Sequence, residues 1–117
     1  MNPWNLESAV VPVTGAASGI GRAICLRLRA AGATPLLLDI NEQDLAAAVR
    51  EVFPEAQGAD PQCHGYVLDV RDSAAVDACF AAIRRDHGLV THAVANAGIS
   101  LAAHVLEITD EQWHRVM

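Results

Sequence analysis

The chain has 117 residues and a formal net charge of −6, with 8 basic residues against 14 acidic ones. This length fits one small domain or part of a larger one, and a hydrophobic content of 52% argues against intrinsic disorder. No basic stripe is present, and no segment reaches the roughly 20 apolar residues of a membrane-spanning helix. We therefore expect no nucleic-acid partner and no membrane association.

Three cysteines, Cys25, Cys63 and Cys79, lie far apart and form no CxxC pair. An odd number of scattered cysteines is typical of free thiols in a reducing compartment. The first residues have neither the charged start nor the apolar run of a signal peptide. Together these features predict a cytoplasmic protein. The five histidines share no ligand spacing, so we expect no metal site.

Short apolar runs alternate along the chain with segments of helical period. Residues 9–14 form a β-branched run that predicts a strand, and residues 19–31 predict a helix that Gly32 ends. Residues 34–40 predict a second strand. Pro12 lies inside the first of these strands and has no N–H for a central ladder, so we expect a bulge or a missing hydrogen bond there.

The second half of the chain continues this alternation. Asn41 is placed to cap a helix that ends before Pro54, and a loop leads to a third predicted strand over 63–70. Asp72 or Ser73 is expected to cap the next helix.

That helix ends at Gly88, residues 89–95 predict a fourth strand, and a further helix is expected near Thr109. Strands alternating with helices predict an α/β fold with a doubly wound parallel sheet and right-handed crossovers. Strands that are apolar throughout fit a sheet covered on both faces.

The strongest motif is residues 14–21, T-G-A-A-S-G-I-G, which stand between the first predicted strand and the first helix. Glycines let a backbone approach a phosphate, and a helix N-terminus offers it N–H groups and a positive dipole end. The alternative is a Gly-rich turn without a ligand. The spacing T-G-x-x-x-G-x-G resembles that of the short-chain dehydrogenase/reductase family. This resemblance implies that the cofactor phosphates and ribose are contacted by Gly15, Ser18, Gly19 and Ile20, while Gly21 permits close helix packing.

Asp39, followed by Ile40, ends the second predicted strand and is the next candidate. A carboxylate there accepts hydrogen bonds from the adenosine ribose hydroxyls and repels a 2′-phosphate. Ser18 stands where many NADP-preferring relatives carry a basic residue. These positions favour NAD and make NADP the weaker candidate. The alternative is that Asp39 only caps the following helix.

Two further elements extend the resemblance. Asp69 and Val70 end the third predicted strand, where family members contact the adenine ring. Residues Asn96, Ala97 and Gly98 match an Asn-Ala-Gly element that brings the chain near the cofactor ribose. By themselves, Asp69 can equally be a loop carboxylate and the other three residues a turn without a ligand.

The resemblance covers essentially the whole chain and implies a Rossmann-type sheet, truncated after its fourth strand and the start of the next helix. Catalysis in the family uses Ser, Asn and a Tyr-x-x-x-Lys pair. This chain has one tyrosine, Tyr66, with Val70 four residues later, and no lysine. Residues 1–117 are therefore expected to be a single partial dinucleotide-binding domain without catalytic residues, the catalytic half being absent.

These observations predict the NAD-binding portion of an oxidoreductase that moves a hydride between an alcohol or carbonyl substrate and a nicotinamide. The resemblance implies a homo-oligomer for the complete enzyme. Two alternatives stay open at this point: a non-catalytic nucleotide-binding or interaction module, and a truncated product without independent function.

Overall fold

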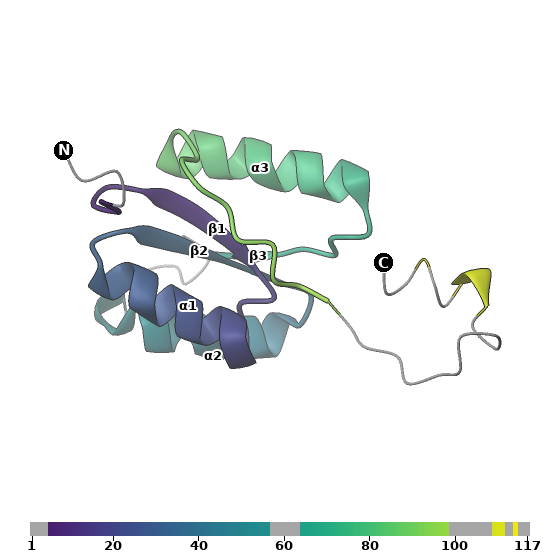
Figure 1. Cartoon of the computed structure of the whole chain (residues 1–117), viewed down its shortest axis with the longest axis horizontal. Helices are drawn as coiled ribbons and strands as arrows, with labels where there is room; N and C mark the ends of the chain where they lie inside the picture. Colours follow the sequence, from purple (N-terminus) through teal and green to yellow (C-terminus); the bar gives the residue numbers. More distant parts are fainter. Residues whose placement is uncertain (1–4, 57–63, 99–108, 112–113, 115–117) are drawn as a thin grey trace.

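The computed structural model describes residues 5–56, 64–98, 109–111 and 114. Its strands, β1 (Val10–Thr14), β2 (Thr34–Asp39) and β3 (Gly65–Val67), form a parallel sheet in the order β1-β2-β3. Its helices are α1 (Gly19–Ala30), α2 (Glu42–Val52) and α3 (Ser73–His87), with a short 3-10 helix, η1 (Pro54–Ala56). Figure 1 shows α1 and α2 on one face of the sheet and α3 on the other. This is the predicted α/β arrangement of a truncated Rossmann fold.

The central residues of β1 and β2 are buried on both faces of the sheet because their side chains alternate between two apolar layers. Val13 and Leu37 belong to the layer formed with α1 and α2, whereas Leu36 and Leu38 pack with Ile83 of α3. All five side chains are almost fully buried. The sheet is therefore held rigidly between its helices, which fixes the positions of the strand ends.

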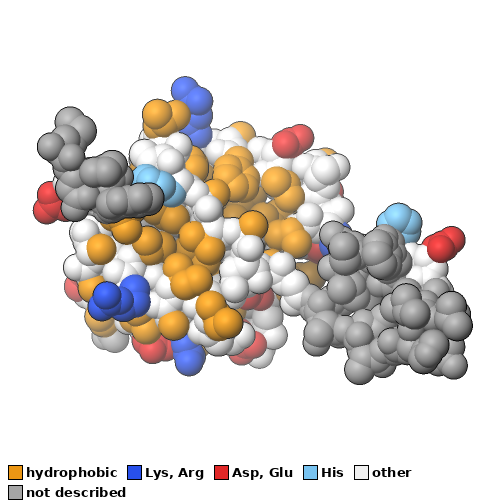
Figure 2. Space-filling model, viewed as in Figure 1, with side chains coloured by type: hydrophobic (Ala, Val, Ile, Leu, Met, Phe, Trp, Pro, Cys, Tyr) orange, Lys and Arg blue, Asp and Glu red, His pale blue; other side chains and the backbone are white. Residues whose placement is uncertain are grey.

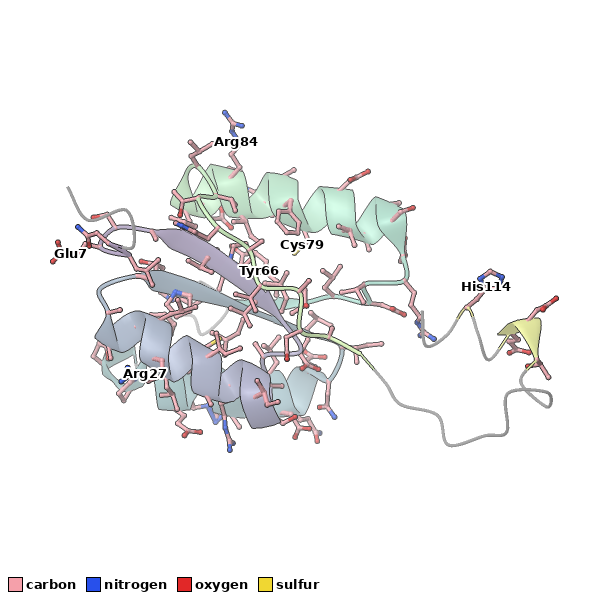
Figure 3. The ribbon with its side chains drawn as sticks, viewed as in Figure 1. Glu7, Arg27, Tyr66, Cys79, Arg84 and His114 are labelled. Carbon is pink, nitrogen blue, oxygen red and sulfur yellow. The ribbon has the colours of Figure 1, made fainter. Side chains whose placement is uncertain are left out.

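Two cysteines lie in the described part of the chain, and both are free and buried. Burial raises the pKa of the Cys25 thiol to about 12. Cys79 lies on the side of α3 turned toward the sheet, whereas Arg84 points away from it (Figure 3). The two cysteines act as small core residues. Cys63 lies outside the described residues.

The prediction of a fourth strand over residues 89–95 was wrong. Residues 89–95 run beside β1, but only one isolated parallel bridge forms between the two segments, from Val13 to Val94. The predicted third strand is also too long, since β3 covers Gly65–Val67 and not 63–70. Figure 2 shows hydrophobic side chains gathered between α1 and α3, on the face that carries this segment.

Pro12 accounts for the weak pairing of the fourth segment. The Pro12 carbonyl accepts from the Val94 N–H (2.9 Å), and Thr14 N–H donates to the Val94 carbonyl (3.1 Å). In a parallel ladder the N and C=O of one residue point to the same side. The nitrogen of Pro12 therefore faces residues 89–95 and has no hydrogen to donate, so the expected missing bond falls there. Toward β2, Pro12 keeps regular register with Leu36.

No helix within the described ranges is long and apolar enough to cross a membrane. Of the helix predicted near Thr109, residues 110, 111 and 114 are helical, and the rest lies outside the described residues.

Candidate nucleotide-binding site

A cleft of about 570 Å³ opens at the carboxyl ends of the strands, where open parallel sheets bind their ligands. It is lined by predicted site residues from every motif: Gly15, Ser18, Asp39, Ile40, Asp69, Val70, Asn96, Ala97 and Gly98. The other predicted residues, Gly19, Ile20 and Gly21, begin α1 directly after Ser18. Leu38, Leu68 and Arg71 also line the cleft and were not predicted. The fold thus brings four separated motifs together.

The three glycines of the turn between β1 and α1 have different structural roles. Gly15 and Gly19 have φ values of 64° and 59°, in the region that favours glycine. A Cβ added to Gly21 would lie 2.1 Å from the Gly15 carbonyl oxygen, so Gly21 lets α1 pack on the turn. A Cβ added to Gly19 meets no protein atom within 4 Å. The backbone at Gly19 therefore borders open space into which a ligand can fit.

The N-terminus of α1 is left without a side-chain cap. Ser18 occupies the N-cap position, yet its side chain makes no capping hydrogen bond, and the first turn contains no acidic residue. The first N–H groups of a helix have no partner within the helix, and they carry the positive end of its dipole. This end of α1 therefore has the chemistry of an anion-binding site.

The Asp39 carboxylate braces the Gly-rich turn from the end of β2. Its Oδ2 accepts from the Ala17 N–H (3.1 Å), and its Oδ1 accepts from the Asn41 N–H (3.0 Å). The cap of α2 is Asn41, whose side chain accepts from the Asp44 N–H (3.0 Å), so Asp39 is not the helix cap. A carboxylate offers about four acceptor positions, which leaves one on each oxygen of Asp39.

Asp69 forms an ion pair with Arg71 at the far side of the cleft. The Arg71 backbone N–H and Nε–H both donate to Oδ1 of Asp69 at 3.0 Å, and Nη2 donates to Oδ2 at 2.8 Å. The hydrogen bonds from Arg71 lower the pKa of the Asp69 carboxyl to about 2. Arg71 was not predicted, and the one signal in the sequence that could have indicated it is its opposite charge two residues after Asp69.

Thr14 joins the first motif to the last. Its Oγ1 accepts from the backbone N–H groups of Asn96 and Ala97, both at 3.0 Å, while the Asn96 side-chain amide donates to the Gly15 carbonyl oxygen (3.3 Å). This clasp ties the Gly-rich turn to the Asn-Ala-Gly segment across about 80 residues of chain. Thr14 opens the predicted motif, but its role in the clasp was missed.

Tyr66 is unsuited to proton transfer. Its hydroxyl donates to Oδ2 of Asp86 (3.0 Å), and it lines a second groove, between α2 and α3. Burial, followed by the contact with Asp86, raises its pKa, whereas an acid-base tyrosine needs a lowered one. Among the described residues there is also no cluster of His, Cys, Asp and Glu that could hold a metal ion.

Comparison with known proteins gives a consistent match. The model of the short chain dehydrogenase family matches residues 9–117. A probable oxidoreductase, EphD, of Mycobacterium tuberculosis is 38% identical over 108 residues, covering 92% of this chain and 18% of that protein. The 2,3-dihydro-2,3-dihydroxybenzoate dehydrogenase of Bacillus subtilis is 34% identical, covering 97% of this chain and 42% of the enzyme.

A further relative is the granaticin polyketide synthase putative ketoacyl reductase 1 of Streptomyces violaceoruber. It is 41% identical over 111 residues, covering 95% of this chain and 39% of that protein. The chain therefore spans less than half the length of each of these relatives.

Proposed function

The chain belongs to the short-chain dehydrogenase family, and we propose that its 117 residues form the NAD-binding part of an oxidoreductase. The whole enzyme would transfer a hydride between an alcohol or carbonyl substrate and the cofactor. A bound nicotinamide supplies the hydride donor or acceptor in this chemistry. The residues of this chain bind and orient the nucleotide.

The phosphates are assigned to the start of α1. Its N–H groups lack a side-chain cap, and the space beside Gly19 is open. An anion placed there would accept hydrogen bonds from Gly19, Ile20 and Gly21, the N–H groups that begin the helix. The absence of an acidic residue from the first turn removes the charge that would repel it. This uncapped helix end is the observation that carries the proposal.

The adenosine is assigned to the side of the cleft formed by Asp39 and Asp69. The two acceptor positions left on Asp39 match the two hydroxyls of an unmodified ribose. Among the described residues that line the cleft, the only Lys or Arg is Arg71, and its charge is matched by Asp69. A 2′-phosphate would thus meet the negative charge of Asp39 without a free cation, which favours NAD over NADP.

Titration of the 117-residue chain with NAD and with NADP tests this proposal directly. We expect NAD to bind at least about tenfold more tightly, since a misplaced charge costs 1.4 kcal/mol or more. Equal affinities would refute the NAD preference. Failure of both nucleotides to bind a folded chain would refute the nucleotide site itself.

The isolated chain is expected to bind nucleotide without turnover. It has no lysine, and its one tyrosine has a raised pKa. NADH formation from alcohols by the pure polypeptide, lost in Tyr66→Phe, would contradict this expectation. Homo-oligomerisation of the whole enzyme and a cytoplasmic location stay predictions.

A further inference from the structure

We propose that Arg71 is a positioning residue that sets base selectivity, by holding Asp69 so that its remaining acceptor position receives an amino group of the nucleotide base. This inference rests on the proposed nucleotide site. It concerns a residue that the sequence motifs did not single out. Arg71 and Asp69 both line the cleft.

The hydrogen bonds of the pair leave little freedom to the carboxylate. Oδ1 of Asp69 accepts two hydrogen bonds from Arg71, and Oδ2 accepts one. Since a carboxylate offers about four acceptor positions, one stays open, on Oδ2. The fork of the guanidinium fixes the plane of the carboxylate, because both oxygens are bound in parallel. The open position therefore has a defined direction.

The chemistry of the open position selects the base. An ionised carboxylate only accepts hydrogen bonds. The 6-amino group of adenine can donate to it, whereas the 6-oxo group of hypoxanthine is an acceptor and is repelled. The hydrogen bonds from Arg71 also keep the pKa of Asp69 at about 2, so the carboxylate stays charged at neutral pH. Without the Arg71 guanidinium, only the backbone N–H of residue 71 would still hold Oδ1, so Oδ2 would lose its fixed direction.

A second arginine pair provides the internal contrast. Arg85 donates from Nε to Oδ1 of the neighbouring Asp86 (3.2 Å), a single side-chain bond, in the groove between α2 and α3. Surface pairs of this kind contribute little to stability. The Arg71 pair differs in its two-pronged geometry and in its place at the cleft.

The test compares NAD with nicotinamide hypoxanthine dinucleotide, which differs at the 6 position of the purine. We expect the 117-residue chain to prefer NAD by about tenfold, as for one hydrogen bond to a charged group. Arg71→Ala is expected to reduce that preference to about threefold or less. Arg71→Lys keeps the charge without the fork, so its preference should lie between the two. Arg85→Ala is the matched control and should leave the preference unchanged.

Two outcomes would refute the role of Arg71 and leave the nucleotide site standing. One is equal binding of the two dinucleotides by the wild type, and the other is an unchanged preference in a folded Arg71→Ala chain. If Arg71→Ala does not fold, Arg71→Lys decides, since a preference equal to that of the wild type would refute the need for the fork. Binding of neither dinucleotide would instead refute the nucleotide site and this inference with it.

Discussion

The helices α1, α2 and α3 each follow the carboxyl end of a strand, yet of these only α2 and α3 have an N-terminus capped by a side chain. Asn41 accepts from the Asp44 N–H (3.0 Å) at α2, and Asp72 accepts from the Ala75 N–H (3.1 Å) at α3. At α1, Ser18 occupies the same position without such a bond. The three turns occupy equivalent places in the topology. The first N–H groups of the helix are capped by a side chain at α2 and α3, but not at α1.

On the proposed function, this difference separates the two turns that only begin a helix from the turn that would hold the cofactor phosphates. A side-chain cap stabilises a helix by about 1 kcal/mol, so its absence at α1 gives up stability that α2 and α3 retain. The uncapped end lies at the cleft, where an anion can replace the missing cap. The missing side-chain cap therefore distinguishes the start of α1 from the starts of α2 and α3.

The largest expected effect on NAD affinity comes from filling the open space beside Gly19, at the N-terminus of α1. Gly19→Val should weaken NAD binding by about 100-fold or more, because the side chain occupies the phosphate position and several charge-assisted hydrogen bonds are lost. Titration calorimetry measures this loss. A Cβ added at Gly19 meets no protein atom within 4 Å, so we expect the fold to lose about 1–2 kcal/mol, mainly through the left-handed backbone.

Gly88→Val is the control for Gly19→Val. Gly88 also has a positive φ (89°) and open space around it, but it ends α3, outside the cleft lining. It should lower the free energy of unfolding and leave NAD affinity unchanged. Wild-type affinity in Gly19→Val would show that the turn does not hold the phosphates.

The next effect is on cofactor choice. Asp39→Asn keeps one acceptor oxygen but removes the negative charge, so the preference for NAD over NADP should fall about tenfold. Paired titrations with the two nucleotides measure this ratio. Asp72→Asn makes the same chemical change at the cap of α3 and should leave the ratio unchanged. A ratio that Asp39→Asn does not alter would mean that Asp39 only braces the turn.

A smaller effect on NAD affinity tests whether the missing side-chain cap of α1 serves anion binding. Ser18→Asp should add a cap to α1, raising the free energy of unfolding by about 0.5–1 kcal/mol, while NAD affinity falls about fivefold because the carboxylate competes with the phosphates. Asn41→Ala, in contrast, removes the cap of α2. It should lower the free energy of unfolding by about 1 kcal/mol and leave NAD affinity unchanged. Urea unfolding and titration measure the two quantities. Undiminished affinity in Ser18→Asp would contradict an anion site at this helix end.

The smallest effect concerns the opposite, amino end of the sheet. His64 stacks on Phe53 (ring centroids 3.9 Å apart), and burial, followed by the charges of His87 and Arg29, lowers its pKa. The folded state therefore favours neutral His64, and its contribution to stability is lost as the pH falls below about 6.5. Urea unfolding at pH 8 and pH 5 should show this loss, reduced in His64→Gln. An identical pH dependence in His64→Gln would exclude His64 as its source.

The sequence predicted the turns and caps well because these depend on neighbours in the chain. Asn41, Asp72 and the glycines of the first turn act within a few residues of their own positions. The fourth strand was predicted from its apolar run, but its pairing depends on Pro12, which lies about 80 residues earlier. The roles of Thr14 and Arg71 were missed, since neither a hydroxyl nor a loop arginine reveals its partner by type.

By itself, the sequence determined the family, the order of the elements and the motif at each strand end. Only the tertiary structure decided that Asp39 braces the turn at Ala17, that Thr14 clasps Asn96, and that Arg71 orients Asp69. The physical reason is that periodicity and capping are local, whereas a site at the end of a parallel sheet forms where strands distant in sequence end side by side.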